Sequence, residues 1–288
     1  MQDLCKQYNV DYQECKNWYN GYKLNGCEIY NPESVVMLME NKEFGNYWAK
    51  TSSYKVIIDR LRKNFDGLQD AILDMLCNKS VEVDVDSFLN TMTDFTSKDS
   101  VLTYLIHIGY LAYNQEDKTC RIPNKEVMLE WRRAIKNSEE YKTTDKIIEQ
   151  SKELLQSTIE MNSDEVVKAL DINHLHATTS RSYTNEDGLQ CAIYLSYMYA
   201  INDYTILRES PTGKGIEDMV YIPIRPENPA LIIELKNNRD PDIALEQIRN
   251  KQYFTSLEHY KGNLLFVGIN YDQETKKHTC KIEKFVKD

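Results

Sequence analysis

The stretch that decides the fold begins with IEDMVYIPI (residues 216–224) and ends with ALIIELK (residues 230–236). Both segments are rich in β-branched and apolar residues, which predicts two neighbouring β-strands. Side chains alternate along a strand, so Glu234 and Lys236 are expected to project from one face while Leu235 points to the other. The second strand therefore carries a polar pair on one face near its end.

The turn RPENPA (residues 225–230) is short enough to fold the first strand back beside the second. This arrangement brings Asp218 to the rim that carries Glu234 and Lys236. Two acids and a cation at the end of an otherwise apolar sheet are costly to place there without a partner. Mg²⁺ (or Mn²⁺) is a suitable partner because it prefers carboxylate oxygens. The pattern predicts a metal site and metal-dependent cleavage of a phosphodiester.

Four further groups are candidates to complete this site. The carbonyl oxygen of Leu235 is a candidate third metal ligand, and Lys236 is placed beside an attacking water. Glu186 begins a buried helix and can reach the metal from the side, although Glu186 or the adjacent Asp187 can also act only as a helix cap. Gln247, in the first turns of a following helix, can donate hydrogen bonds to the lysine, the water or a phosphate oxygen.

The rest of the C-terminal part predicts a sheet with helices around it. The order is a buried helix, three strands, a helix and a strand, followed by one last strand, and this order favours an α/β (α+β) sandwich in which helices cover a mixed sheet. The expected helices are 186–202 and 241–260, and the expected strands are 204–210, 216–224, 230–236, 263–272 and 278–286.

The N-terminal part reads as mainly helical. Helices followed by a β-hairpin and another helix suggest a winged-helix-like unit. We expect two domains: residues 1–137, helical and winged-helix-like, and residues 138–288, connecting helices and the mixed sheet. The expected helices begin at Asn31-Pro32 and lie within 53–78, 84–92, 97–111 and 126–137, and the hairpin lies within 109–127.

Bulk composition is that of a globular protein, with 41% hydrophobic and 28% charged residues in a chain of 288. No apolar run approaches the ~20 residues that span a bilayer, and no export signal opens the chain, so a cytoplasmic protein away from membranes is expected. The seven cysteines form no C-x-x-C pair, which predicts reduced thiols without a zinc site.

The net charge of −10 is distributed unevenly. From residue 205 onward there are 13 basic and 13 acidic residues, which leaves 22 basic and 32 acidic residues before that point. The acidic total argues against nucleic acid held by charge alone. The neutral C-terminal segment can still hold a phosphate backbone through metal and shape.

The set Glu186, Asp218, Glu234-Leu235-Lys236 and Gln247 resembles the PD-(D/E)XK nuclease superfamily. The resemblance implies metal binding by Asp218 and Glu234, with Lys236 as the catalytic lysine and Glu186 and Gln247 in support. It also implies an α-βββ-α-β core. The position before the aspartate, often proline in this superfamily, is glutamate here.

The chain is more similar to one branch, the nuclease domain that follows an AAA-ATPase-like domain in bacterial proteins. The branch's nucleotide-binding G-x-x-x-x-G-K-[ST] is absent, since SPTGKGIED has glycine after the lysine and leads into a strand. The chain therefore resembles the rear part of a longer design, and a separate ATPase component is an expected partner. The phrases that carry this likeness are Trp18-Tyr19-Asn20-Gly21-Tyr22, Ile29-Tyr30-Asn31-Pro32, Tyr47-Trp48, Thr51-Ser52 and Gly109-Tyr110-Leu111.

DNA is the expected substrate, and three residues are candidate contacts to it. Lys214, between two glycines, either contacts a phosphate or only forms a tight turn. Lys251 and Tyr253 either face DNA or lie on a helix surface. Aromatic residues around Trp18 can stack on bases, but core packing is the favoured interpretation. The pair His174 and His176 is expected to lie in a loop or on the surface.

Two alternatives of another class remain open. The first is the same fold acting as an inactive binding module, since a fold does not fix a function. The second is a winged-helix regulator in which the N-terminal part binds DNA.

Overall fold

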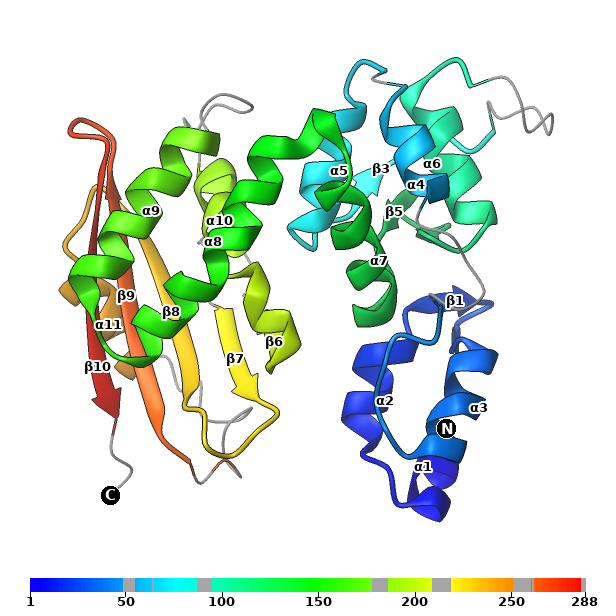
Figure 1. The fold of residues 1–288 in the computed structure, drawn as a ribbon, viewed down its shortest axis with the longest axis horizontal. Helices are drawn as coiled ribbons and strands as arrows, with labels where there is room; N and C mark the ends of the chain where they lie inside the picture. Colours follow the sequence, from blue (N-terminus) through cyan, green and yellow to red (C-terminus); the bar gives the residue numbers. More distant parts are fainter. Residues whose placement is uncertain are drawn as a thin grey trace. The chain divides into compact units, whose positions relative to one another are not determined.

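The structure is a computed structural model that describes residues 1–48, 55–63, 65–86, 95–177, 186–208, 219–250, 260 and 262–285. Within these ranges the side chains of residues 175–177, 186–187, 207–208 and 250 are not described. The chain divides into two compact units, Met1–Asp145 and Lys146–Asp288 (Figure 1). The boundary expected from the sequence, after residue 137, lies a few residues before this division.

The N-terminal unit combines helices with short strands. The predicted helix start at Asn31-Pro32, the helix within 97–111, the hairpin and the helix that follows it are confirmed. Within 53–78, where the sequence predicts one or two helices, the described residues form two. The sequence did not predict the first hairpin, and the helix expected over 84–92 lies largely outside the described residues. The elements are α1 (Gln2–Tyr8), α2 (Tyr12–Tyr19), β1 (Tyr22–Leu24), β2 (Cys27–Ile29), α3 (Pro32–Asn41), α4 (Lys55–Leu61), α5 (Leu68–Leu76), β3 (Val81–Glu82), α6 (Lys98–His107), β4 (Ala112–Asn114), β5 (Thr119–Arg121), α7 (Lys125–Lys136) and the 3₁₀ turn η2 (Glu139–Tyr141).

A buried carboxylate holds several of these elements together. Glu126, in the first turn of α7, is 0% exposed. Its Oε1 accepts hydrogen bonds from the backbone N–H groups of Tyr47 and Trp48, both at 2.8 Å. The hydroxyl of Ser34 lies 2.8 Å from the same oxygen, and the amide of Asn31 donates to Oε2 at 3.3 Å. One side chain thus joins α7 to α3 and to the segment that follows α3.

The glycine before the β4–β5 hairpin permits a close contact. Gly109 has a φ of 81°, and a Cβ built on it would lie 2.9 Å from Cη2 of Trp48. The hydroxyl of Tyr22 donates to the carbonyl of Gly109 at 2.6 Å. The indole N–H of Trp131 donates to the next carbonyl, that of Tyr110, at 3.1 Å. The sequence phrases around Tyr22, Trp48 and Gly109 therefore meet at one place in this unit, next to the buried Trp131.

The aromatic residues near the N-terminus serve core packing, as expected. Trp18 is 9% exposed and belongs to a buried cluster formed by α1, α2 and α3. Its ring lies 6.5 Å from that of Phe44, and the ammonium of Lys125 lies 4.6 Å from its centre.

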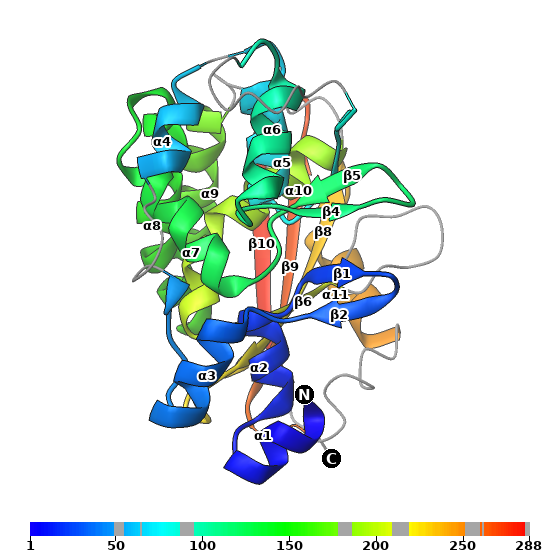
Figure 2. The ribbon, with the colours of Figure 1, turned by 90° about the vertical axis from the view of Figure 1, so that its right-hand side faces the viewer.

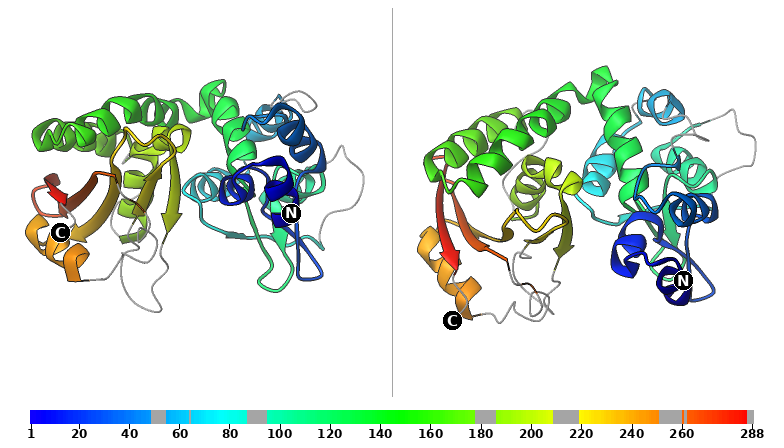
Figure 3. Two further views of the ribbon diagram at one scale, coloured as in Figure 1. Left: turned by 90° about the horizontal axis from the view of Figure 1, so that it is seen from below. Right: turned by 60° about the horizontal axis from the view of Figure 1, so that its bottom comes forward.

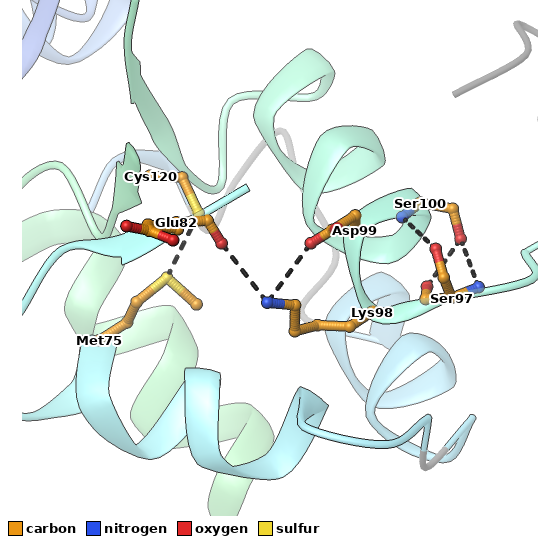
Figure 4. Close-up of polar contacts among 7 residues, drawn as sticks. All are labelled: Met75, Glu82, Ser97, Lys98, Asp99, Ser100 and Cys120. Atoms are coloured by element: carbon orange, nitrogen blue, oxygen red, sulfur yellow. Dashed lines mark hydrogen bonds and ion pairs between the residues drawn. The ribbon is translucent and has the colours of Figure 1, made fainter. Parts of the chain in front are cut away.

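The two hairpins of the N-terminal unit lie side by side, with β1 against β4 (Figure 2). The short sheet in the described part of this unit has the order β3-β5-β4. Helix α6 begins with a capping box between Ser97 and Ser100, and the Lys98 ammonium lies 3.5 Å from the carbonyl of Glu82 in β3 (Figure 4). The helix start is thereby fixed against the edge of the sheet.

The C-terminal unit is a mixed α/β structure. Its predicted helices and strands are confirmed where the structure describes them, although helix 241–260 is described only to residue 250. In the described part of this unit the five strands form one sheet in the order β10-β9-β8-β7-β6. The elements are α8 (Lys142–Ile159), α9 (Ser163–Ala177), α10 (Glu186–Ser196), the 3₁₀ turn η3 (Met198–Asn202), β6 (Tyr204–Arg208), β7 (Met219–Pro223), β8 (Ala230–Asn237), α11 (Pro241–Asn250), β9 (Leu264–Asp272) and β10 (Lys277–Phe285).

The sheet has one parallel pair, and helices cover both of its faces. Strands β8 and β9 run parallel, and the connection between them includes α11, whereas the other neighbours are antiparallel. Figures 1 and 3 show α8, α9 and α10 on one face and α11 on the other. Apolar residues of β7, β8, β9 and α11 form the core on the α11 face: Val220, Ala230, Ile232, Leu245, Ile248, Leu264 and Phe266.

The prediction of reduced thiols for all seven cysteines is confirmed for five of them: Cys5, Cys15, Cys27, Cys120 and Cys280. Cys77 and Cys191 are not among them. Along the described ranges, none of the helices has both the length and the apolar character needed to cross a bilayer.

Candidate functional site

The centre of the candidate site is an ion pair on strand β8. Glu234 and Lys236 lie two residues apart and therefore share a face, and the Lys236 ammonium contacts Oε1 of Glu234. The Glu234 side chain is 0% exposed, whereas that of Lys236 is 14% exposed. The predicted pairing of these two residues on one face is present, and the carboxylate lies deeper than the ammonium.

This pair lies on the face of the sheet that α11 covers. Ile232, two residues before Glu234, packs against Leu245 and Ile248 of α11. Opposite Glu234 on β9 is Gly268. A Cβ on this glycine would lie 2.6 Å from the carbonyl oxygen of Pro241. The start of α11 therefore approaches the sheet closely beside the candidate site.

Asp218 lies outside the described residues, but its chain neighbour is placed. Met219, the next residue, pairs with Ile233, the residue directly before Glu234. The antiparallel pairing of β7 with β8, expected from the short turn, is confirmed. Val220 belongs to the apolar cluster on the α11 face.

Gln247 lies on α11 and is partly buried. Two ion pairs identify the side of α11 that faces β10: Asp242 with Lys281, and Arg249 with Glu283. At 3.6 residues per turn, Gln247 is turned by roughly 140–160° from Asp242 and Arg249. It therefore lies on the side of the helix away from β10.

The other predicted residues are placed only in part. Leu235 is 1% exposed and points to the face opposite Glu234. Glu186 is the first residue of α10, as predicted, but its side chain is not described. Lys214, Lys251 and Tyr253 lie outside the described residues.

Carboxylate oxygens fit the ligand preference of Mg²⁺, and Glu234 is the predicted ligand whose carboxylate is described. In the side chains that the structure describes, no group of three or more His, Cys, Asp or Glu residues is placed to hold a metal ion. The predicted set also includes Asp218 and Glu186, whose side chains lie outside that description.

The opposite face of the sheet carries a polar cluster that the sequence did not predict. The hydroxyl of Tyr271 on β9 lies 3.0 Å from Nε2 of His174 on α9, and the two rings stack with their centres 4.6 Å apart. Nδ1 of His278, on β10, lies 2.8 Å from Oδ1 of Asp171. The sequence interpretation of His174 as a loop or surface residue is wrong, because the residue is helical and 5% exposed. The side chain of His176 is not described.

Burial dominates the ionisation of this cluster. It lowers the pKa of His174 to about 4, with a further lowering from His278. It also lowers the pKa of His278, against the opposing effect of the hydrogen bond to Asp171. Both rings are therefore neutral near pH 7. They connect α9 to β9 and β10 on the face away from Glu234.

Comparison with known proteins adds little about this site. No family model matches the chain. A stretch of 52 residues is 36% identical to an uncharacterised protein from the vnfD 5′ region of Azotobacter chroococcum mcd 1. The match covers 18% of this chain and 10% of that protein.

Proposed function

We propose that this protein is a metal-dependent nuclease of the PD-(D/E)XK type that hydrolyses DNA phosphodiester bonds. The observation that carries the proposal is the Glu234–Lys236 pair on one face of β8. Beside it lies β7, whose first described residue, Met219, follows Asp218 in the sequence. The order of the elements from α10 to β9 supports it, because it agrees with the α-βββ-α-β order that the resemblance implies.

Each residue has a role in this proposal. Asp218, Glu234 and the carbonyl of Leu235 hold Mg²⁺ or Mn²⁺, with Glu186 contributing from α10. The metal, when bound, activates a water and neutralises charge on the phosphate. Lys236 lies beside the water and favours its deprotonated form, and Gln247 orients the lysine, the water or a phosphate oxygen. The water oxygen forms a bond to phosphorus while the bond to the leaving oxygen breaks.

The partners in this proposal are DNA and a separate ATPase component. Lys214, Lys251 and Tyr253 are the proposed DNA contacts of the C-terminal unit. The N-terminal unit is proposed to be winged-helix-like, which the order of α6, the β4–β5 hairpin and α7 supports.

A second candidate function is a nuclease-fold module without turnover, acting in nucleic-acid or protein binding. The burial of Glu234 favours this candidate, because its side chain is 0% exposed and already paired with Lys236. An ion pair in this position is sufficient to neutralise a buried carboxylate without a metal. The two candidates differ in whether Glu234 exchanges its lysine partner for a metal ion.

A cleavage assay tests the first candidate. Purified protein with Mg²⁺ or Mn²⁺ is expected to nick or degrade DNA, and EDTA is expected to stop it. Asp218→Ala removes a proposed metal ligand and is expected to abolish cleavage. Lys236→Ala is expected to reduce the rate by roughly 10²–10⁴-fold, the range for loss of acid–base assistance. Lys277→Ala, an exposed lysine at the start of β10, is the matched control and keeps full activity. Equal rates in all variants would identify a contaminant and exclude the proposal.

Calorimetry with Mn²⁺ separates the two candidates without a DNA substrate. The nuclease binds Mn²⁺, and Asp218→Ala abolishes the heat of binding. A module without turnover need not bind Mn²⁺, so the absence of binding heat in the wild type favours the second candidate.

A further inference from the structure

The turn that follows Lys236 is fastened to strand β9. It joins the end of β8 to the start of α11 and includes Asn238, which has a φ of 54°. The backbone N–H of Asn238 donates to the carbonyl of Tyr271 at 2.8 Å. The side chains of Asn238 and Gln273 also bond across the gap, with a distance of 3.3 Å. Asn238 therefore connects the turn to the end of β9 through Tyr271 and Gln273.

Asn270 of β9 makes a second connection to this turn. Its Oδ1 accepts a hydrogen bond from the backbone N–H of Arg239 at 2.8 Å. The residue is 5% exposed, and its register partner on β8 is Lys236. Asn270 lies two residues after Gly268, so its side chain is on the α11 face, the face of Lys236.

The position of Asn270 links three parts of the candidate site. In the register it stands beside Lys236, just as Gly268 stands beside Glu234. Its hydrogen bond holds the turn that leads into α11, the helix that carries Gln247. If this bond is lost, the β8–β9 pairing and the bonds of Asn238 remain, but the start of α11 is held to β9 less tightly. The positions of Lys236 and Gln247 then become less well defined.

We propose that Asn270 is a positioning residue for the candidate site, which it serves by holding the β8–α11 turn. This inference rests on the proposed nuclease function. Asn270 acts through Arg239 and Lys236 and is not itself a catalytic residue. The geometric requirement is strict, because a misplacement of about 1 Å can reduce a rate by roughly 10²-fold.

The test compares three variants in the DNA cleavage assay with Mn²⁺. Asn270→Ala removes the acceptor and is expected to reduce kcat by roughly 10–100-fold, with KM for DNA changed less than about twofold. Asn270→Asp keeps an oxygen acceptor at the same place and is expected to recover most of kcat. Gln273→Ala removes the exposed bond to the same turn and is the matched control, with kcat close to that of the wild type.

Hydrogen exchange gives a readout that does not depend on activity. The amide of Arg239 is expected to exchange faster in Asn270→Ala than in the wild type or in Asn270→Asp. Faster exchange with an unchanged kcat would overturn the positioning role and leave the nuclease proposal intact. An Asn270→Asp protein as slow as Asn270→Ala would also overturn it. A wild-type protein that cleaves no DNA would overturn the nuclease proposal, and the positioning role with it.

Discussion

Among the described residues, a fully buried glutamate lies in each unit, and these two glutamates are held in different ways. Glu126 in the N-terminal unit and Glu234 in the C-terminal unit are both 0% exposed. Neutral donors surround Glu126, including two backbone N–H groups and a serine hydroxyl. Glu234 instead contacts the ammonium of Lys236, a flexible group that is 14% exposed.

The difference separates a structural carboxylate from a candidate functional one. Burial raises the pKa of Glu126, while the hydrogen bonds from Trp48, Ser34 and Tyr47 lower it in part. These donors belong to the fold and do not move without disrupting it. A lysine side chain has several rotatable bonds and can leave its carboxylate, which makes room for a metal ion. Complete burial therefore indicates a structural role for Glu126, whereas for Glu234 it is compatible with the proposed functional role.

The largest loss in the free energy of unfolding is expected from Glu126→Ala. This change leaves two backbone donors and a hydroxyl without their acceptor, and each such loss destabilises by about 1–3 kcal/mol. We expect the free energy of unfolding to fall by roughly 4 kcal/mol, measured by urea denaturation. Glu116→Ala is the control, because Glu116 is an exposed residue of the β4–β5 turn, and its effect is expected to stay within about 0.5 kcal/mol. Similar losses in the two variants would show that the Glu126 network contributes little.

The next largest loss of stability is expected from Lys236→Ala in the C-terminal unit. Removing one partner of a buried ion pair is destabilising, and we expect a loss of about 3 kcal/mol in the free energy of unfolding. Because a metal ion that binds only the folded state stabilises it, Mn²⁺ is expected to restore part of the loss. Thermal unfolding with and without Mn²⁺ measures both quantities. If Mn²⁺ leaves the melting temperature unchanged in both proteins, Glu234 is a structural carboxylate like Glu126.

Two glycine substitutions, Gly268→Ala and Gly26→Ala, compare the effect of tight packing beside Glu234 with the effect of backbone strain in the N-terminal unit. In Gly268→Ala the new Cβ meets the backbone carbonyl oxygen of Pro241 at 2.6 Å, so α11 has to shift. We expect a loss of roughly 2 kcal/mol in the free energy of unfolding, together with reduced cleavage. Gly26→Ala has open space around it but a φ of 78°, so its loss is expected to be about 1 kcal/mol without an effect on cleavage. Equal cleavage by both variants would mean that α11 does not position the site.

The last comparison concerns pH and the histidine cluster, which lies on the face of the sheet opposite Glu234. The pKa of His174 is lowered from 6.5 to about 4, chiefly by burial, and Asp171 opposes this shift while Lys276 adds to it. Protons therefore bind the unfolded chain first, and the contribution of the neutral ring is complete above pH 6.5 and declines as pH falls toward 4. Urea midpoints measured between pH 7 and 4 are expected to fall less steeply in His174→Phe than in the wild type. Parallel curves would contradict this assignment.

Much of the fold was predictable because its signals are local. Asn31-Pro32 begins α3 as expected, since proline is favoured in the first helical turn. Alternation placed Glu234 and Lys236 on one face, and the short turn set the pairing of β7 with β8. The β1–β2 hairpin was not predicted, because both strands are three residues long and mostly exposed.

The partners of the buried groups were not predictable from the sequence. His174 and Tyr271 are separated by 97 positions, and nothing local to either indicates the other. The same holds for Glu126 and Ser34, which are 92 positions apart. Asn270 was missed for a related reason, since an asparagine near the end of a strand has no signal of its own until its partner in the turn is placed.

The sequence by itself determined the strands of the C-terminal unit, the β4–β5 hairpin, most of the helices and the shared face of Glu234 and Lys236. These features depend on periodicity and on neighbours in the chain. Only the tertiary structure decided that Glu234 is fully buried, that α11 covers its face and that Asn270 holds the adjoining turn. The physical reason is that burial and hydrogen-bond partners depend on segments that are distant in the sequence and meet only in the folded chain. A local sequence pattern does not show which segments will meet.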